Sequence, residues 1–278
     1  MKKWDQENIW LAFSTLTFLT IPWIVVSLLV QHLFHVLAAI PIYLLLILIG
    51  SGFIFGIGMI LFTFSLKYAG LGIAFILNIS LGAVFGSLLP TLMLDKGEFF
   101  STFELLHIVA MLLFIAGVIA ASTAVKRRSL NKSSMQNSNK IRLLGILFGS
   151  LSGFFTSFQG ISYAYTFPKI QAIGRQLGIS RVGIDNVPWI AIFSAAFIPY
   201  AIYFFCRTMK NKSYVNYIHR DIKRYWFFIL IMGVFYFSSL LFYSYSASLI
   251  GSFGPALSWP IMMIFIILTS NFWGIVQG

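Results

Sequence analysis

The segment GSGFIFGIGMILFTFSLKYAGLGIAFILNISLGAVFGSLLPTLM, residues 50–93, decides the fold of this chain. It consists of two long apolar runs joined by a short turn that contains Gly70, with one charged residue, Lys67, beside Tyr68 at the joint. A helix of about 20 apolar residues is long enough to cross the hydrocarbon core of a bilayer. The segment therefore predicts two membrane-spanning helices that form a hairpin.

A later segment, FSSLLFYSYSASLIGSFGPALSWPIMM at residues 237–263, is similar to the first. A shift of about 181 positions aligns Phe62 with Tyr243, Phe64 with Tyr245, Ser65 with Ser246 and Gly70 with Gly251. Internal repeats in an apolar chain are typical of transporters built from two related halves. The alternative is that any two helices rich in Phe and Gly share this much similarity.

The composition indicates an integral membrane protein. Of the 278 residues, 59% are hydrophobic and 9% are charged, and the mean hydropathy is +0.90. Soluble domains average about 25% charged residues, so a soluble globule would not hide this much apolar surface. The apolar runs are long and lack the alternation of barrel strands, which favours an all-α bundle of transmembrane helices.

The net charge of +12 does not indicate a nucleic-acid partner, because of where the charges lie. Most Lys and Arg residues fall in two loops, residues 126–142 and 207–224, and both loops flank predicted spans. Such an excess marks cytoplasmic loops. The single cysteine, Cys206, excludes an internal disulfide.

Eight spans are predicted, at residues 9–30, 40–66, 71–93, 103–125, 143–166, 187–206, 225–247 and 253–276. They form one transporter domain, in which the polar cytoplasmic linker 126–142 separates half one, residues 1–125, from half two, residues 143–278. Residues 167–186 hold several charges and are interpreted as a surface helix or long loop. The loops with more Lys and Arg place the N-terminus of the chain in the cytoplasm.

The repeat relates spans two and three to spans seven and eight, which is an offset of five spans. Successive spans cross the membrane in alternating directions, so an offset by an odd number of spans reverses the direction. The related pairs are therefore predicted to cross the membrane in opposite directions, as an inverted repeat that lets a carrier open alternately to each side. An offset of five also predicts halves of five spans. The first span of half one and the last span of half two are then absent from this sequence.

Several short sequence features occur in a characteristic order. They are Lys3-Trp4 with Glu7 and Trp10, Pro22-Trp23, Gly56-x-Gly58, Leu66-Lys67-Tyr68-x-Gly70 with Gly72, Pro168-Lys169, Leu177-Gly178, Pro188 and Ser258-Trp259. Together they resemble the L-rhamnose/proton symporter family of the drug/metabolite transporter superfamily, over nearly the whole chain. The family has ten spans. Lys67 stands where the family usually has Arg, and the two are not equivalent where the guanidinium group of Arg makes a bidentate contact.

The resemblance implies a secondary carrier in the cell (cytoplasmic, or inner) membrane that imports a small sugar, L-rhamnose first of all, with a proton. The alternatives are a carrier of another small metabolite in the same superfamily, or a truncated membrane protein that does not transport.

A sugar site needs amides and hydroxyls for specificity and an aromatic surface for packing. Polar side chains inside spans are costly, so they are the candidates. We expect substrate contacts from Gln159 above all, because it lies mid-span among small residues, and also from Asn78, Tyr163, Tyr245, Trp259 and Asn271. The alternative role is interhelical hydrogen bonding for the amides and an interfacial belt for the aromatic residues.

Proton coupling needs a group that changes its charge, and none of the seven acidic residues falls in the middle of a predicted span. Glu104 and His107 are three residues apart, so a helix would place them on one face, and they are the candidate proton pair. An ordinary interfacial pair is the alternative. Lys67 and Tyr68 are candidate gating residues at the joint, although such a lysine more often extends to the cytoplasmic face.

The sequence lacks the common signatures of enzymes. It has no Gly-rich phosphate loop followed by Lys-Ser/Thr, no His-Glu-x-x-His and no Gly-x-Ser-x-Gly. We therefore expect no catalytic residue, no cofactor and no metal. The expected partners are a sugar, a proton and the lipid bilayer, while the sequence does not indicate an oligomeric state.

Overall fold

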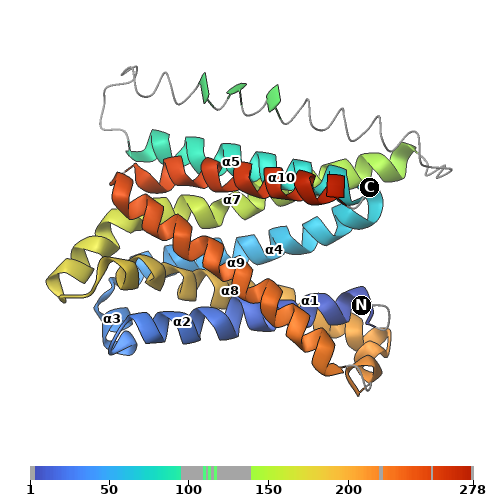
Figure 1. Ribbon diagram of the computed structural model, residues 1–278, viewed down its shortest axis with the longest axis horizontal. Coiled ribbons are helices and arrows are strands. Elements are labelled where there is room, and N and C mark those ends of the chain that lie inside the picture. The colour runs from blue at the N-terminus through green and yellow to red at the C-terminus, as the bar shows by residue number, and fades with distance from the viewer. Residues whose placement is uncertain are drawn as a thin grey trace. The chain divides into compact units, whose positions relative to one another are not determined.

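The computed structural model of the chain describes residues 4–94, 109–110, 112–113, 116–117, 139–218, 222–251 and 253–276 (Figure 1). All regular elements within these residues are helices. Those long and apolar enough to cross a membrane are Gln6–Leu29, Ile42–Ala69, Gly72–Thr91, Leu143–Gln176, Arg181–Lys210 and Ile222–Ile250, with a shorter apolar helix at Gly254–Thr269. This confirms an all-α membrane bundle. Most of predicted span 103–125 lies outside the described residues, so the count of eight stays a prediction.

The chain divides into two compact units. Unit 1 comprises Met1–Ile57 and Thr166–Ser252, and unit 2 comprises Gly58–Tyr165 and Phe253–Gly278. Helices α4 (Ile42–Ala69) and α7 (Asn139–Gln176) are continuous, and each has residues in both units. Each unit combines segments from both predicted repeat halves, residues 1–125 and 143–278. The division into repeat halves therefore stays a prediction.

Unit 1 is built around α8 (Arg181–Lys210). The elements that pack against α8 include α1 (Gln6–Ser14), η1 (Thr15–Thr20), α2 (Ile21–Leu29) and α9 (Ile222–Ile250). The unit also contains the short helices α3 (Leu33–Ala39) and η2 (Ser213–Ile218). A helix enclosed in this way needs an apolar surface on most sides, and many residues of α8 between Gly183 and Phe204 are buried.

Small residues let α4 approach α8 closely. A Cβ atom at Gly52 would collide with the backbone oxygen of Ile192, and one at Gly56 would collide with that of Ala196. Such contact between backbones is common in membrane bundles, where association depends on packing. The glycines of α4 allow close packing at these two positions, whereas Gly50 has no neighbour within 4 Å.

The first span contains one turn of π-helix, η1, between α1 and α2. Pro22 lies just after it, and a proline lacks the N–H group and clashes with the carbonyl group of the preceding turn. The wider π turn accommodates this interruption. Thr20 Oγ1 donates to the oxygen of Thr15 at 3.0 Å, which supplies a local partner for a backbone group.

An aromatic cluster forms the core of unit 1 around Phe18 of η1. The Phe18 ring is stacked on Phe193 at 5.4 Å between centroids and meets the edges of Phe55 at 5.7 Å and Tyr200 at 5.8 Å. Offset and edge-to-face pairs of this kind add to the free energy of apolar burial. The cluster therefore joins η1 to α4 and α8.

The predicted surface helix or loop at 167–186 is wrong, because α7 continues to Gln176 and α8 begins at Arg181. Phe167, Ile170 and Gly174 are buried on one side of α7, while the charged residues of this stretch lie on its other faces. Gly178, with φ +67, ends α7: the N–H of Ile179 donates to the oxygen of Gly174 at 2.9 Å.

In unit 2, α5 (Leu71–Leu94) packs against α10 (Gly254–Val276), and the two lie side by side in Figure 1. Phe62 of α4 meets Phe75 of α5 edge-on at 5.0 Å, and Phe85 meets Phe154 of α7 at 5.1 Å. These contacts join α4, α5 and α7 within the unit.

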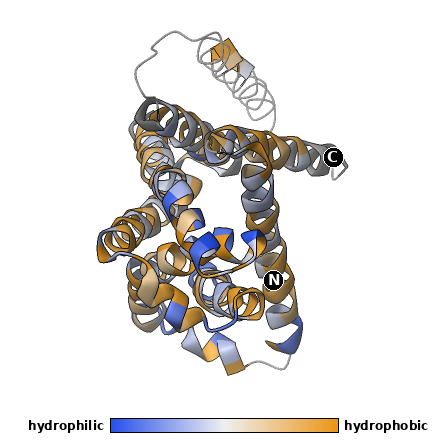
Figure 2. Cartoon of the chain, turned by 90° about the vertical axis from the view of Figure 1, so that its left-hand side faces the viewer, coloured by the Kyte–Doolittle hydropathy of each residue, from blue (hydrophilic) through white to orange (hydrophobic). Residues whose placement is uncertain are grey.

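The outward surface of the helices is apolar, as a bilayer requires. Figure 2 looks along the helices and shows hydrophobic residues around most of each. Large apolar side chains such as Leu28, Phe34 and Phe235 are exposed, at 81%, 75% and 74%. Exposure of this extent is expected where lipid replaces water as the solvent.

Candidate functional site

A chain of polar contacts joins three helices in unit 2. Asn78 of α5 donates from Nδ2 to Ser152 Oγ at 2.6 Å and to Thr156 Oγ1 at 3.2 Å, both on α7. Ser152 Oγ in turn donates to the backbone oxygen of Gly58 on α4 at 2.8 Å. Polar groups within a membrane must find partners in the protein, and these do.

Gln159 continues this polar face of α7, because it lies three residues after Thr156. Its side chain is 6% exposed, and its Oε1 atom has no hydrogen-bond partner among the residues that the structure describes. A buried acceptor without a partner costs about 1–3 kcal/mol. Gln159 therefore offers an acceptor to a group that is not part of the described chain.

Trp259 of α10 packs over two glycines next to this face. Its Nε1 atom donates to the oxygen of Gly82 at 3.1 Å, and the residue is 1% exposed. A Cβ atom at Gly160 would lie 3.1 Å from the indole ring, and one at Gly86 would lie 2.5 Å from it. The indole ring thus fills a slot formed by the backbones of α5 and α7.

The structure brings together four of the predicted substrate contacts in unit 2. Gln159 and Tyr163 lie one turn apart on α7, Asn78 contacts Thr156 on the same helix, and Trp259 lies over Gly160. Tyr163 is fully buried and Asn78 is half-buried. The binding role of each stays a prediction, while the contacts of Asn78 and Trp259 show the interhelical role directly.

The other predicted site residues do not join this group. Tyr245 belongs to unit 1, on α9, and is 50% exposed. Asn271 is a residue of α10 whose side chain lies outside the described part of the structure. Glu104 and His107 also lie outside it, so their role in proton coupling stays a prediction.

Lys67 and Tyr68 lie at the end of α4. Lys67 is exposed, and its Nζ atom lies 5.4 Å from the centroid of the Tyr68 ring. The Tyr68 ring is stacked on Phe148 of α7 at 6.0 Å. A cation over an aromatic face at an exposed site contributes about 0.5–1 kcal/mol. This geometry fits a lysine that extends out of the membrane, and a gating role stays a prediction.

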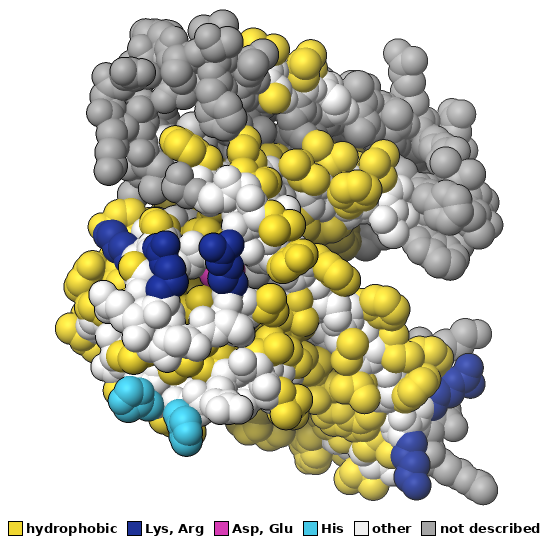
Figure 3. Space-filling view, turned by 60° about the vertical axis from the view of Figure 1, so that its left-hand side comes forward, with side chains coloured by type: hydrophobic (Ala, Val, Ile, Leu, Met, Phe, Trp, Pro, Cys, Tyr) yellow, Lys and Arg dark blue, Asp and Glu magenta, His cyan; other side chains and the backbone are white. Residues whose placement is uncertain are grey.

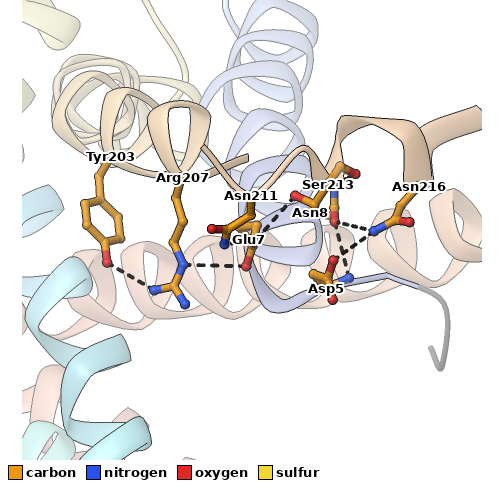
Figure 4. A network of polar contacts seen from close by, with 8 residues as sticks. All are labelled: Asp5, Glu7, Asn8, Tyr203, Arg207, Asn211, Ser213 and Asn216. Carbon is orange, nitrogen blue, oxygen red and sulfur yellow. Dashed lines mark hydrogen bonds and ion pairs between the residues drawn. The ribbon is translucent and has the colours of Figure 1, made fainter. Parts of the chain in front are cut away.

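Unit 1 contains a polar network that sequence analysis did not identify (Figure 4). Glu7, in the first turn of α1, is buried, and its Oε2 atom lies 3.6 Å from Nε of Arg207. Asn211 Nδ2 donates to Glu7 Oε1 at 2.6 Å, and Ser213 Oγ lies 3.4 Å from the same atom. The network ties the start of α1 to the end of α8.

Asn8 and η2 extend the same network. Asn8 Nδ2 donates to the oxygen of Ser213 at 3.0 Å, and Asn216 Nδ2 donates to Asp5 Oδ2 at 2.9 Å. Tyr217 Oη donates to the oxygen of Asn8 at 3.0 Å. Burial raises the pKa of the Tyr217 hydroxyl, which keeps it a donor. The signal in the sequence was Glu7, which was noted only as part of the family resemblance.

A second buried polar cluster of unit 1 lies where α7 ends and α8 begins. Asp185 accepts a hydrogen bond from Gln171 Nε2 at 2.9 Å and is 1% exposed. Asn186, the next residue, is 1% exposed, and its Oδ1 atom has no hydrogen-bond partner among the described residues. Sequence analysis missed both residues because it placed 167–186 outside the membrane.

Comparison with known proteins gives a consistent result. A family model described as L-rhamnose-proton symport protein (RhaT) matches residues 1–277. An L-rhamnose-proton symporter of Yersinia pestis (strain Pestoides F) is 21% identical over 287 residues, covering 99% of this chain and 82% of the relative. One of Escherichia coli O17:K52:H18 (strain UMN026 / ExPEC) is 20% identical over 288 residues, with the same coverage. No solved structure matches the chain.

Proposed function

The chain belongs to the L-rhamnose-proton symporter family, a family of transporters, and from this premise we propose that it imports L-rhamnose together with a proton. It is a multi-pass membrane protein with helices suited to that role. The proposed mechanism is alternating access, in which the binding site opens to each side of the membrane in turn. The proposed location is the cytoplasmic membrane, with the N-terminus of this chain inside.

One observation in the structure carries the proposal for the substrate: in a membrane-spanning helix, the acceptor of Gln159 has no partner among the described residues. A sugar is neutral and rich in hydroxyl groups, so it binds through donors and acceptors that carry no charge. A hydroxyl that donates to Gln159 Oε1 would remove the cost of burying that atom. Asn78 of α5, which contacts Thr156 one turn before Gln159 on α7, adds an amide that is already held in position.

The turns after α4 and α9 support the proposed inverted repeat. Gly70 ends the first of the two related segments with φ +82, and Gly251 ends the second with φ +98. These are the two glycines that the sequence repeat aligns, and each occupies a conformation that favours glycine. A shared turn geometry at aligned positions supports related hairpins.

Uptake of labelled L-rhamnose tests the proposal. Cells that lack their own rhamnose carrier should accumulate the sugar when they express this chain, and an imposed proton gradient, acid outside, should increase the accumulation. Glucose or galactose in excess should compete poorly. Uptake that ignores the identity of the sugar, or the proton gradient, would contradict the proposal.

A carrier of another small metabolite is the second candidate, and the low identity of 21% to the relatives favours keeping it. A thermal-shift screen of the purified chain over sugars and amines separates the two. Stabilisation by L-rhamnose supports the first candidate, because a ligand stabilises the folded state that binds it. Stabilisation by a different compound alone supports the second.

A further inference from the structure

Three helices of unit 1 meet at the carboxyl group of Asp185. The residue lies in α8, one turn after its start, and is 1% exposed. Gln171 of α7 donates to its Oδ1 atom at 2.9 Å. Ser248 of α9 lies close to it, and Arg181 acts on it through its positive charge.

The partners of Asp185 suit both of its protonation states. A serine hydroxyl donates to a carboxylate and, after rotation, accepts from a carboxylic acid, and a glutamine amide offers both an N–H and a C=O group. Arg181 is exposed, so solvent and salt screen its charge. An ionised carboxylate buried among apolar residues is costly, and a bound proton removes that cost.

Glu7, the other buried acid in the described part of the chain, has different surroundings. Its partner Arg207 is a guanidinium group, which only donates and does not lose its proton. Glu7 is therefore held as one half of an ion pair that fixes α1 to α8. Asp5 is exposed. Asp185 accepts its hydrogen bond from the neutral amide of Gln171, and Arg181, a cation that acts on it, is exposed, so this acid can gain and lose a proton.

The position of Asp185 fits the entry of a proton. α7 ends at Gln176, α8 begins at Arg181 and α9 ends at Ile250, so the acid lies near the ends of three helices. The predicted orientation places these ends on the outer side of the membrane. Figure 3 shows Lys and Arg side chains gathered here, with a trace of an acidic side chain among them. Asn186, the next residue in the chain, has a buried acceptor with no partner among the described residues.

We propose that Asp185 is the proton-coupling residue of this chain. A proton from the outer side binds a carboxylate oxygen of Asp185 to form the neutral acid, and the same proton leaves to the inner side as the carrier turns over. This inference rests on the proposed symport. Its tests separate binding of a proton from transport of a sugar.

Infrared difference spectroscopy of the purified full chain, between alkaline and acidic pH, tests proton binding without any sugar. All the acids of the chain protonate over this range, so the variants are compared for one band, the C=O band of a carboxyl group shielded from water. The parent should show this band, Asp185→Asn should lack it, and the control Asp5→Asn should keep it. Asp185→Glu, which keeps an acid at this position, should show a shifted band and serves if Asp185→Asn does not assemble. Survival of the shielded-carboxyl band in Asp185→Asn, or its absence from the parent, overturns the proposal.

Transport in proteoliposomes tests coupling. Asp185→Asn should lose the accumulation of L-rhamnose driven by a pH gradient but retain the exchange of internal for external sugar, and Asp185→Glu should recover some accumulation. An acid with a purely structural role would not separate the two activities. Gradient-driven accumulation in Asp185→Asn equal to that of the parent, or loss of exchange together with accumulation, overturns the proposal. A parent that shows the infrared band but transports no rhamnose overturns only the proposed substrate and supports the proton site.

Discussion

Two amide side chains on neighbouring helices of unit 2 have opposite surroundings. Both donor contacts of Asn78 are made, to Ser152 and Thr156, so this side chain holds α5 against α7. Gln159 is buried beside it with an acceptor that has no partner among the described residues. An unsatisfied buried acceptor is costly to the folded state, and binding of a ligand is one reason to keep it.

Replacement of Gln159 by alanine should therefore weaken binding without loss of stability. The variant Gln159→Ala removes an unpaired buried group, and we expect it to insert normally and to unfold at the parent's temperature or above. Loss of one hydrogen bond of about 1.4 kcal/mol should weaken the apparent affinity for the transported sugar about tenfold. Uptake measured against sugar concentration checks this. The control is Gln176→Ala, an exposed glutamine on the same helix, and equal affinities in the two variants would refute the role of Gln159.

Trp259 should contribute mainly to stability, because its ring is enclosed by protein. Trp259→Ala should destabilise the chain by about 3–5 kcal/mol, as for other large buried side chains. Trp259→Phe should cost less, since it keeps an aromatic ring and loses mainly the hydrogen bond to Gly82. Thermal unfolding in detergent measures both. Phe265→Ala, at a residue of α10 that is 64% exposed, is the control, and an equal loss there would contradict the packing of Trp259.

At the scale of single elements, the sequence predicted the apolar middles of the helices better than their ends. The predicted spans were 143–166 and 187–206, whereas the helices run from Asn139 to Gln176 and from Arg181 to Lys210. A hydropathy average falls wherever charges enter, but α7 and α8 expose Arg175 and Arg181 and bury Ile170 and Ile184. Gly178 and Ser180 marked the true turn, as a helix end and a helix cap.

The close contact between α4 and α8 predicts a sharp difference between two glycines of one helix. Gly52→Ala should destabilise the chain by about 1–3 kcal/mol, because the new methyl group meets the backbone of Ile192, which cannot move without the helix. Gly50→Ala should be neutral or slightly stabilising, since no atom lies within 4 Å and alanine favours helix. Thermal unfolding of the two variants in the same detergent decides, and equal unfolding temperatures would contradict this contact.

At the scale of the whole molecule, composition and periodicity were enough to predict a helical membrane protein, and the order of the short sequence features was enough to predict the family. The candidate site was predicted only in part, and the binding roles of its residues stay predictions. Asn78, Gln159 and Trp259 were found because each is a polar or aromatic residue within an apolar run. Asp185 was missed because burial of a charged residue depends on Gln171 and Ser248, which are distant in sequence and adjacent only in the fold.

The predicted orientation of the chain decides which side supplies the proton to Asp185, and labelling of single cysteines tests it. In a Cys206→Ser background, which removes the native cysteine, Lys210→Cys at the end of α8 should react with an impermeant maleimide only in inside-out vesicles. His35→Cys, on α3, should react in intact cells. Both parent side chains are exposed, so the labelling reports the side of the membrane, and the background variant alone is the blank. The reverse pattern would place Asp185 at the cytoplasmic end, where it would release the proton instead of receiving it.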